Sequence, residues 1–220
     1  MFGFGKKDTD QKVGLGDNPS SDEINRILGR LPKGINPDQV TFEKGLPHHI
    51  SLSLRDFLDH GQAILTECPT IVALTLHNLD DDDCSRLASS SLLNRITSLN
   101  LEHTGTYKFI SAKGVASLIG SPNLTALTAL NLANNKLGDR AAELLAASHN
   151  MHALTKLTLA HNKINYRGAA SLAASRHLTG LHILDLGYNN IGSRGIAALA
   201  ASTNLNTLTA LHLGAIPGSQ

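Results

Sequence analysis

The most regular feature of the chain is the spacing of its leucines, which begins near Ile71 and continues to Leu213. Four segments with the pattern Leu-x-x-Leu-x-Leu begin at positions 127, 154, 181 and 208, so they repeat every 27 residues. Two earlier segments have isoleucine in the first place. Because alternate residues of a strand face opposite sides, this pattern predicts six short strands, each with one buried face. They are expected in segments 71–76, 96–101, 127–132, 154–159, 181–186 and 208–213.

Alanine and leucine fill the intervals between these segments and predict one short helix in each interval. The clearest runs begin at Gly168 and Gly195 and read GAASLAAS and GIAALAAS. A serine lies six residues before five of the six strand segments, at positions 90, 121, 148, 175 and 202. From position 71 onward the chain therefore repeats a strand, a turn and a helix, an α/β arrangement in which neighbouring copies stack.

One copy is similar to a known family. Residues 181–191 read LHILDLGYNNI, are followed by a helix-forming stretch at 195–200, and resemble a leucine-rich repeat of the ribonuclease-inhibitor-like subfamily. The resemblance extends over residues 64–216 and implies an α/β leucine-rich repeat solenoid, with a curved parallel β-sheet on the concave face and helices on the convex face. The asparagines that this family stacks along its turns, where their amides satisfy backbone groups, correspond here to Asn135, Asn162 and Asn189.

The residues before the repeats divide into two parts. Residues 1–20 are rich in glycine and charge and are expected to form a mobile tail. From Ser21, apolar residues at helical spacing predict a helix that Pro32 ends, and a second amphipathic stretch follows further along. We therefore expect an N-terminal helical cap over residues 21–64, covering the edge of the first repeat, and a leucine-rich-repeat domain of about six repeats over residues 65–220.

An alternative for the cap comes from the motif Leu46-Pro47-x-x-Ile50, with Leu54 beyond it, which resembles the opening of an F-box. Such a module ahead of leucine-rich repeats would make the chain an F-box-like ubiquitin-ligase substrate adaptor. Too few residues separate Leu46 from the first repeat for a complete F-box, so a plain cap is the favoured interpretation.

Composition and charge exclude several classes of partner. Lys and Arg number 19 against 18 Asp and Glu, so the net charge of +1 gives no strong field toward nucleic acid or an anionic membrane. No run approaches the roughly 18 apolar residues of a membrane helix, and the first residues are too polar for a signal peptide. Two cysteines, Cys68 and Cys84, cannot make a disulfide framework. We expect a cytoplasmic location, or delivery into a host cell without a signal peptide.

Function is expected on the concave face, where the side chains between the leucines point to solvent. Tyr188 is the expected anchor, because aromatic side chains carry a large share of the binding energy of interfaces. The long repeat that begins at Ile96 has an extra loop, which exposes Tyr107 and Lys108 as a second contact. For any single position, an ordinary solvated side chain is the alternative. The residues expected to bind a protein partner on the concave face are His77, Asn78, His103, Asn131, Lys156, His161, His182, Asp185, Tyr188 and His212.

These patterns predict a non-enzymatic module for protein–protein interaction, with no cofactor and no bound metal. An alternative in a different class is a His-based or metal-dependent enzyme that uses His161, His182 and Asp185, which come from adjacent strands. No nucleophile, phosphate-binding loop or paired carboxylate accompanies these residues, so the enzyme interpretation is disfavoured.

Two further expectations concern the partner. The alanine-rich helices and the short cap are similar in style to leucine-rich-repeat effectors that intracellular bacteria deliver into host cells, which implies a host protein as partner. After the last strand only GAIPGSQ remains, so no helix covers the last layer of the solenoid. Weak self-association through this C-terminal edge is therefore expected.

Overall fold

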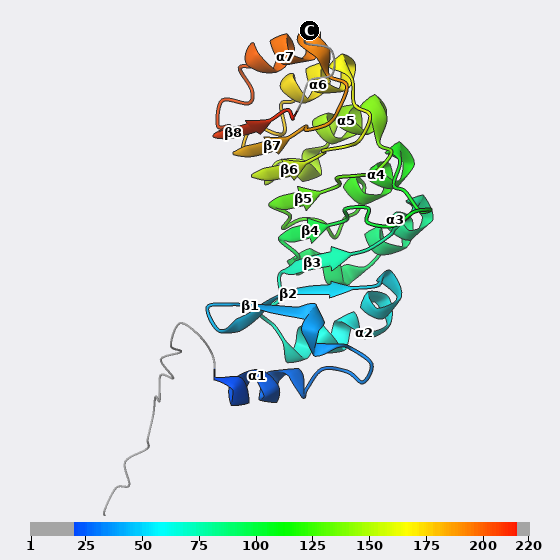
Figure 1. The fold of residues 1–220 in the computed structure, drawn as a ribbon, viewed down its shortest axis with the longest axis vertical. Coiled ribbons are helices and arrows are strands. Elements are labelled where there is room, and N and C mark those ends of the chain that lie inside the picture. Colours follow the sequence, from blue (N-terminus) through cyan, green and yellow to red (C-terminus); the bar gives the residue numbers. More distant parts are fainter. Residues whose placement is uncertain (1–19, 215–220) are drawn as a thin grey trace, which may run out of the picture.

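The computed structural model describes residues 20–214, and its eight strands form one sheet in which they follow sequence order. Figure 1 shows the strands stacked along the inner side of a curved arc and the helices along its outer side. The helices are α1 (Ser21–Leu28), α2 (Leu54–Glu67), α3 (Asp81–Ala88), α4 (Ala112–Ile119), α5 (Gly138–Ala147), α6 (Tyr166–Ala173) and α7 (Gly192–Ala200). The strands are β1 (Val40–Glu43), β2 (Leu46–Leu52), β3 (Ala73–Leu76), β4 (Ser98–Asn100), β5 (Ala129–Asn131), β6 (Lys156–Thr158), β7 (Ile183–Asp185) and β8 (Ala210–His212).

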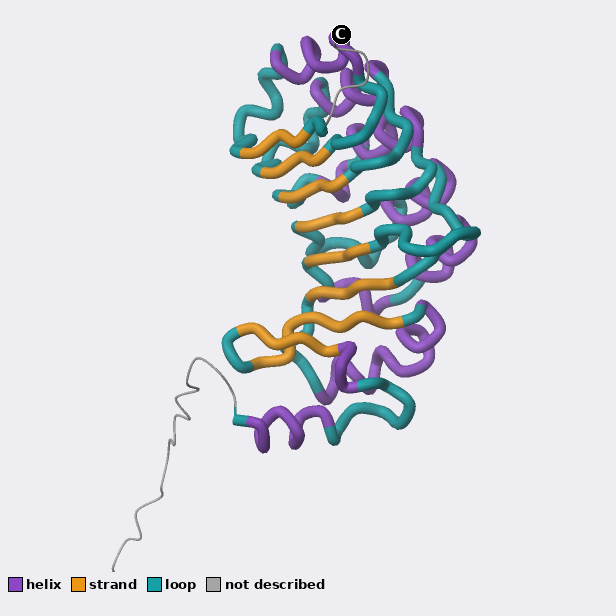
Figure 2. The backbone as a smooth tube through the Cα atoms, viewed as in Figure 1, coloured by secondary structure: helices purple, strands orange, loops and turns teal. Residues whose placement is uncertain are grey.

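The register of the sheet follows the leucine pattern. From β2 to β8 every strand is parallel to its neighbour, and the central leucine of each strand pairs with that of the next, as Leu130 does with Leu157 and Leu157 with Leu184. Except for Leu211 in the last strand, these leucines are buried in one continuous core, because they face the helices behind the sheet. The six predicted strands and the α/β solenoid with concave strands and convex helices are thus confirmed (Figure 2).

The N-terminal cap contains a β-hairpin in addition to helices, so the expectation of a purely helical cap is corrected. Strand β1 pairs antiparallel with β2, and β2 pairs in parallel with β3, so that Ile50 lies beside Leu74 and Leu52 beside Leu76. Strand β2 and α2 therefore form one more strand–helix unit of the solenoid. The F-box-like motif from Leu46 to Ile50 lies inside this strand and is part of the common sheet.

Buried asparagines join successive turns. The side chain of Asn162 is fully buried, and its amide donates hydrogen bonds to the carbonyls of Leu132 (2.8 Å) in the preceding repeat and of Ala160 (3.1 Å) in its own. Its amide oxygen accepts from the backbone N–H of Leu137. Asn135 and Asn189 are buried and bonded in the corresponding way, so the asparagine ladder implied by the family resemblance is present.

The serines before the strands form a second ladder on the outer side of the solenoid. The hydroxyl of Ser175 donates to the carbonyl of Ala146, at the end of the preceding helix, over 2.6 Å. Ser121 and Ser202 make the equivalent bond. Because both ladders run to the preceding repeat, each repeat satisfies polar groups that its neighbour leaves open.

Both cysteines are structural. Cys68 is 2% exposed and Cys84 is fully buried, and they belong to the apolar core. Burial is the main cause that raises the pKa of both thiols, and the carboxylates of Asp81 and Asp83 raise that of Cys84 further. A raised pKa keeps a thiol neutral at ordinary pH, which suits packing and disfavours nucleophilic chemistry.

Several expectations concern the ends of the chain. The mobile tail falls almost entirely within residues 1–19, which lie outside the described residues, as do residues 215–220. In the described part, β8 is the last strand of the sheet and Leu211 is partly exposed there. Self-association through this edge and the boundaries at 21–64 and 65–220 stay predictions. Within residues 20–214, no helix combines the length and apolar character needed to cross a bilayer.

Candidate functional site

Two rows of side chains face outward from the concave sheet, one on each side of the buried central leucines. The first row is small toward the N-terminal end and becomes long at Lys156 and Ile183. Its members are Ala73, Ser98, Ala129, Lys156, Ile183 and Ala210. The second row is polar throughout. Its members are Thr75, Asn100, Asn131, Thr158, Asp185 and His212.

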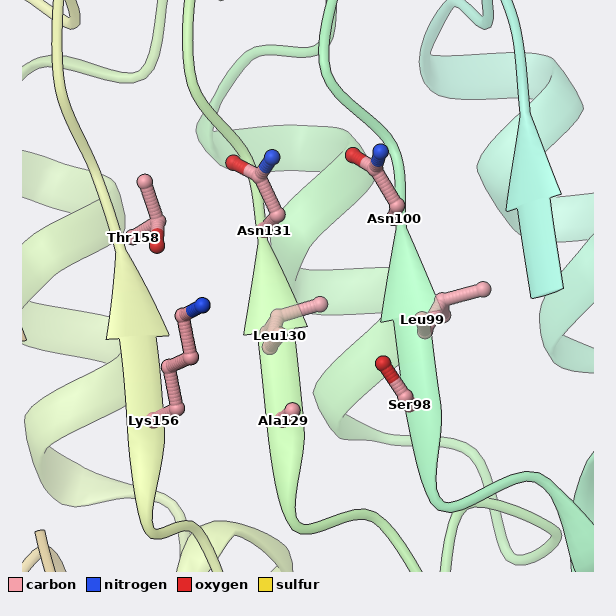
Figure 3. Close-up of a pocket in the computed structure, with 8 residues that line it drawn as sticks. All are labelled: Ser98, Leu99, Asn100, Ala129, Leu130, Asn131, Lys156 and Thr158. Atoms are coloured by element: carbon pink, nitrogen blue, oxygen red, sulfur yellow. The ribbon is translucent and has the colours of Figure 1, made fainter. Parts of the chain in front are cut away.

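The change of side-chain size in the first row leaves a hollow of about 200 Å³ over β4, β5 and β6. We call it the concave hollow. Figure 3 shows Ser98 and Lys156 on either side of Ala129, with both side chains directed toward β5. The residues that line the hollow are Ser98, Leu99, Asn100, Ala129, Leu130, Asn131, Lys156 and Thr158.

The polar groups of the concave hollow differ in how far they are already used. The side-chain oxygens of Asn100 and Asn131 accept hydrogen bonds from the backbone N–H groups of Glu102 and Ala133, two residues further along (3.0 and 2.9 Å). The amide nitrogen of Asn131 donates to the Glu102 carboxylate (3.3 Å). Lys156 is exposed, and within residues 20–214 it has no ion pair. Asn131 is therefore mainly structural, whereas Lys156 is free to bind.

A second feature lies in the turns that follow the strands. Asn78, Asn134, His161 and Tyr188 occupy equivalent places there, with left-handed φ angles of 55° to 58°. The rings of His161 and Tyr188 stack at 4.2 Å between centroids, with 10° between their planes. Tyr188 remains 62% exposed. We call this pair the rim stack, and both of its members were predicted to bind the partner.

His103, also predicted to face solvent, is only 8% exposed, so that expectation is corrected. Its ring stacks on Phe109 at 4.0 Å, and the ammonium of Lys136 lies 3.7 Å from the centre of the Phe109 ring. The cause is the longer second repeat, because its extra loop brings Phe109 over His103. Ile110 from the same loop is fully buried and takes the place of the turn leucine.

The extra loop exposes Tyr107 almost completely, at 92%, as predicted. Lys108 is half-exposed and is already engaged, because its ammonium lies 2.7 Å from Asp83 and 3.1 Å from Asp80. Hydrogen bonds to these two carboxylates raise the pKa of Lys108. The pKa of Asp80 is lowered, mainly by the backbone N–H of Asp83, since the two residues form a capping box at the start of α3. Tyr107 is the freer of the two predicted loop contacts.

The N-terminal end of the concave face carries a group of residues that sequence reasoning missed. The ring of His49 in β2 bonds through Nε2 to the Thr75 hydroxyl (2.8 Å) and through Nδ1 to that of Thr41 (3.3 Å). Burial, followed by the charges of His48 and His77, lowers the pKa of His49. The predicted residue His77 is exposed and bonds to the Ser51 hydroxyl (2.7 Å). The sequence signal that could have revealed this strand is the pair Ile50 and Leu52, which have the same spacing as Leu74 and Leu76 and pair with them in the sheet.

The structure does not assemble the alternative metal or acid–base site from His161, His182 and Asp185. His161 stacks on Tyr188, His182 bonds through Nδ1 to the carbonyl of Gly180 (2.8 Å), and Asp185 accepts from the backbone N–H of Gly187 (2.9 Å). Among the described residues, no group of three or more His, Cys, Asp or Glu side chains is placed to hold a metal ion. His182 and His212 are exposed single side chains of the concave face.

A stacked strand–turn–helix unit, bonded to its neighbour through asparagines and serines, defines a solenoid repeat protein with one continuous open sheet. A family model described as Leucine Rich repeat matches residues 123–146, 149–173 and 176–200, which are three successive units. Residues 123–200 therefore contain three leucine-rich repeats, which lie within the solenoid of eight strands. Its placement in the ribonuclease-inhibitor-like subfamily stays a prediction.

Solved structures with a similar course of the chain include an internalin from Listeria monocytogenes, with 20% sequence identity, a TM-score of 0.32, and coverage of 77% of this chain and 53% of that one. The plant peptide hormone receptor RGFR1 in complex with RGF2 has 16% identity, a TM-score of 0.26, and coverage of 68% and 33%. The chain thus spans about half of the internalin chain and a third of the receptor chain. No curated protein matches the sequence.

Proposed function

We propose that the protein is a non-enzymatic binding module that holds a protein partner on the concave side of its sheet, with the rim stack of His161 and Tyr188 as the anchor. The observation that carries this proposal is the conformation of the two residues. The same turn is occupied by Asn78 and Asn134 in other repeats, and asparagine tolerates left-handed backbone better than most residues.

A bulky ring in left-handed backbone is unfavourable by about 1 kcal/mol or more. The fold does not require rings at this place, since asparagine serves in the equivalent turns. The stacking of His161 on Tyr188 holds both rings in a fixed orientation before any partner arrives. Exposed aromatic groups that are ordered in advance lose little conformational entropy on binding, and such groups often dominate interface energies.

The class of protein agrees with this function, because leucine-rich repeats generally act as scaffolds for protein–protein interaction. The solved plant receptor is in complex with a peptide hormone, which is the kind of occupant that a concave sheet suits. The proposed surface joins the rim stack to Lys156, His182, Asp185 and His212 on the neighbouring strands, with Tyr107 as a contact on the extra loop. A role as a delivered effector, a host protein as partner and a cytoplasmic location stay predictions.

The test uses the full chain carrying Tyr188→Ala and His161→Ala together. Proteins from an extract are captured on immobilised wild type and variant and quantified by mass spectrometry, and the binding of each candidate is then measured with purified protein. The proposal requires at least one partner whose affinity falls about tenfold or more in the variant. Thermal melting should be nearly unchanged, because both rings are exposed and alanine keeps the Cβ that the left-handed backbone already accommodates.

The matched control is Tyr166→Ala. Tyr166 is also an exposed tyrosine, but it begins α6 on the helical side and lies against Arg167 and Arg194. A partner that is retained by the rim-stack variant and lost with Tyr166→Ala would transfer the binding surface to the convex side and refute the proposal.

A further inference from the structure

We infer that the concave hollow receives a single carboxylate side chain from an extended acidic segment of the partner, with Lys156 as its counter-charge. This inference rests on the proposed function of the concave face and specifies the chemistry of its partner. It depends on a part of that face different from the rim stack, so the two can be tested separately.

The shape of the hollow suits one side chain. Ser98 and Ala129 are small, and Lys156 rises beside them as the long member of the same row (Figure 3). A volume of about 200 Å³ compares with roughly 30 Å³ for each water of the liquid, so a side chain of several non-hydrogen atoms fits. The hollow lies over three parallel strands, whose positions are fixed by backbone pairing on both sides.

The cation of the hollow has no ion pair in the described part of the chain. Lys156 is the only charged residue that lines it. Two acidic groups of the same face are held by other hydrogen bonds: Glu102 accepts from the amides of Asn131 (3.3 Å) and Asn134 (2.8 Å), and Asp185 accepts from the backbone N–H of Gly187. An exposed lysine with no carboxylate partner of its own is available to a carboxylate from outside.

The unused polar groups are suited to the same ligand. The Asn100 amide nitrogen and the hydroxyls of Ser98 and Thr158 line the hollow and can all donate hydrogen bonds. The carbonyl oxygen of the Asn100 amide is occupied by the N–H of Glu102, which leaves the amide's donor side for a ligand. Donors around one ammonium group match the acceptor oxygens of a carboxylate. A doubly charged phosphate would call for several cations or an arginine, and the hollow has neither.

The experiment selects binders from a library of random extended peptides displayed on phage, using the immobilised full chain. Four proteins are compared: wild type, Lys156→Glu, Arg176→Glu, and the Tyr188→Ala, His161→Ala double variant. Arg176→Glu is the matched control, because it makes the same change of net charge beside a groove between α5 and α6 on the convex side.

We expect peptides selected by wild type and by Arg176→Glu to share an acidic residue at one position, and those selected by Lys156→Glu to carry Lys or Arg at that position. For the wild-type consensus peptide, replacement of the acidic residue by its amide should weaken binding about tenfold on wild type and have little effect on a fifth protein, Lys156→Met, which lacks the charge. This coupling locates the carboxylate at Lys156.

Three results would count against the inference, and they differ in what else they affect. If wild-type peptides lack acidic preference, or if Lys156→Glu selects the same sequences, the carboxylate is refuted; the proposed function survives when those peptides still need Tyr188 and His161. If peptides selected by Arg176→Glu carry Lys or Arg in place of the acidic residue, the selection depends on the net charge of the protein and the hollow is not the binding site. If acidic peptides bind the double variant as tightly as wild type but fail to bind Lys156→Glu, the rim-stack proposal is wrong and the carboxylate inference is supported. If no peptide binds wild type at all, both are wrong.

Discussion

The carboxylate of Asp139 in α5 accepts a hydrogen bond from the backbone N–H of Gly168 in α6 (3.1 Å), and the same oxygen accepts from Asn165 (2.7 Å). One side chain thus caps the helix of the following repeat. The approach is possible because residue 168 is glycine: a Cβ there would lie 2.7 Å from the Asp139 oxygen. Gly114 in α4 and Asp81 in α3 stand in the same relationship: the Asp81 carboxylate accepts from the backbone N–H of Gly114.

Gly168→Ala should therefore destabilise the protein, although alanine favours helices more than glycine does. The added methyl would also lie 2.7 Å from Cγ2 of Ile164, so both the cap and a core side chain must move. Overpacking of this kind costs about 1–3 kcal/mol, against a propensity gain of about 1 kcal/mol. We expect a net loss of up to about 2 kcal/mol in the free energy of unfolding, measured by urea denaturation.

Gly180→Ala is the control for this experiment, since a Cβ at Gly180 would meet its nearest neighbour at 3.6 Å, an ordinary contact. Its stability should stay within about 0.5 kcal/mol of wild type. If the Gly168→Ala protein is as stable as the control, α5 and α6 can move apart to admit the methyl group at little cost, and the prediction is wrong.

Asn162→Ala should be among the most destabilising polar substitutions in the chain. It removes the donor to the carbonyls of Leu132 and Ala160 and the acceptor of the Leu137 N–H, all within a buried turn. The carbonyls of Leu132 and Ala160 keep the Asn135 amide and the Asn134 N–H as donors, so the main loss falls on the Leu137 N–H. A buried group left without a partner costs about 1–3 kcal/mol when water cannot reach it. We expect a loss of about 1–3 kcal/mol in guanidinium unfolding, while Asn190→Ala, on an exposed side chain in the turn of the next repeat, should be nearly neutral.

Both thiols should resist modification in the native protein. Cys68 and Cys84 are buried and their pKa values are raised, so at pH 8 a thiol reagent should label neither before unfolding and both in denaturant. The ordinary pKa of 9.0 in the unfolded chain is lower than in the folded one, so the unfolded state loses protons first. The free energy of unfolding should therefore fall as pH rises above about 9. Rapid labelling of the native protein would contradict this burial.

His49 should make stability depend on mildly acidic pH. Its pKa is lowered in the folded protein from the ordinary 6.5, so below that pH the unfolded chain binds a proton that the folded chain takes up less readily. Stability from this group is present above pH 6.5 and is lost as pH falls through the folded pKa. His49→Gln should flatten the decrease in the free energy of unfolding below pH 6.5, measured by urea denaturation at a series of pH values.

The repeated part of the fold could be predicted well from the sequence, because the leucines that recur at a fixed spacing are also the residues that the fold buries. Leu130 and Leu157 occupy the same position of successive repeats, face the core and pair with each other, so the spacing of the leucines alone predicts the strands and their register. Strand β2 was missed because Pro47 and two histidines interrupt its apolar alternation, and its pairing with β3 depends on a contact that local pattern does not encode.

The candidate site was only partly predictable for a related reason. Lys156, His161 and Tyr188 were named from their positions in the repeat, but the stack of the two rings depends on left-handed turns that no spacing rule reveals. His103 followed the same positional rule and was misplaced, since the irregular loop carries Phe109 across it. The concave hollow also went unseen, because it arises from short side chains at Ser98 and Ala129, not from any reactive group.

In the ladders of asparagine and serine, side chains of one repeat donate hydrogen bonds to backbone carbonyls of the repeat before it. Removal of one whole 27-residue period, for example residues 154–180, would leave every remaining ladder position facing an equivalent partner. Genetic duplication or loss of single units can therefore lengthen or shorten the sheet without a new folding problem. Such an event would change the length of the concave face in fixed steps of one strand. The unit that is gained or lost carries its own concave side chains with it, since residues 154–180 include both Lys156 and His161, so the architecture ties the length of a recognised segment to the contacts that are made with it.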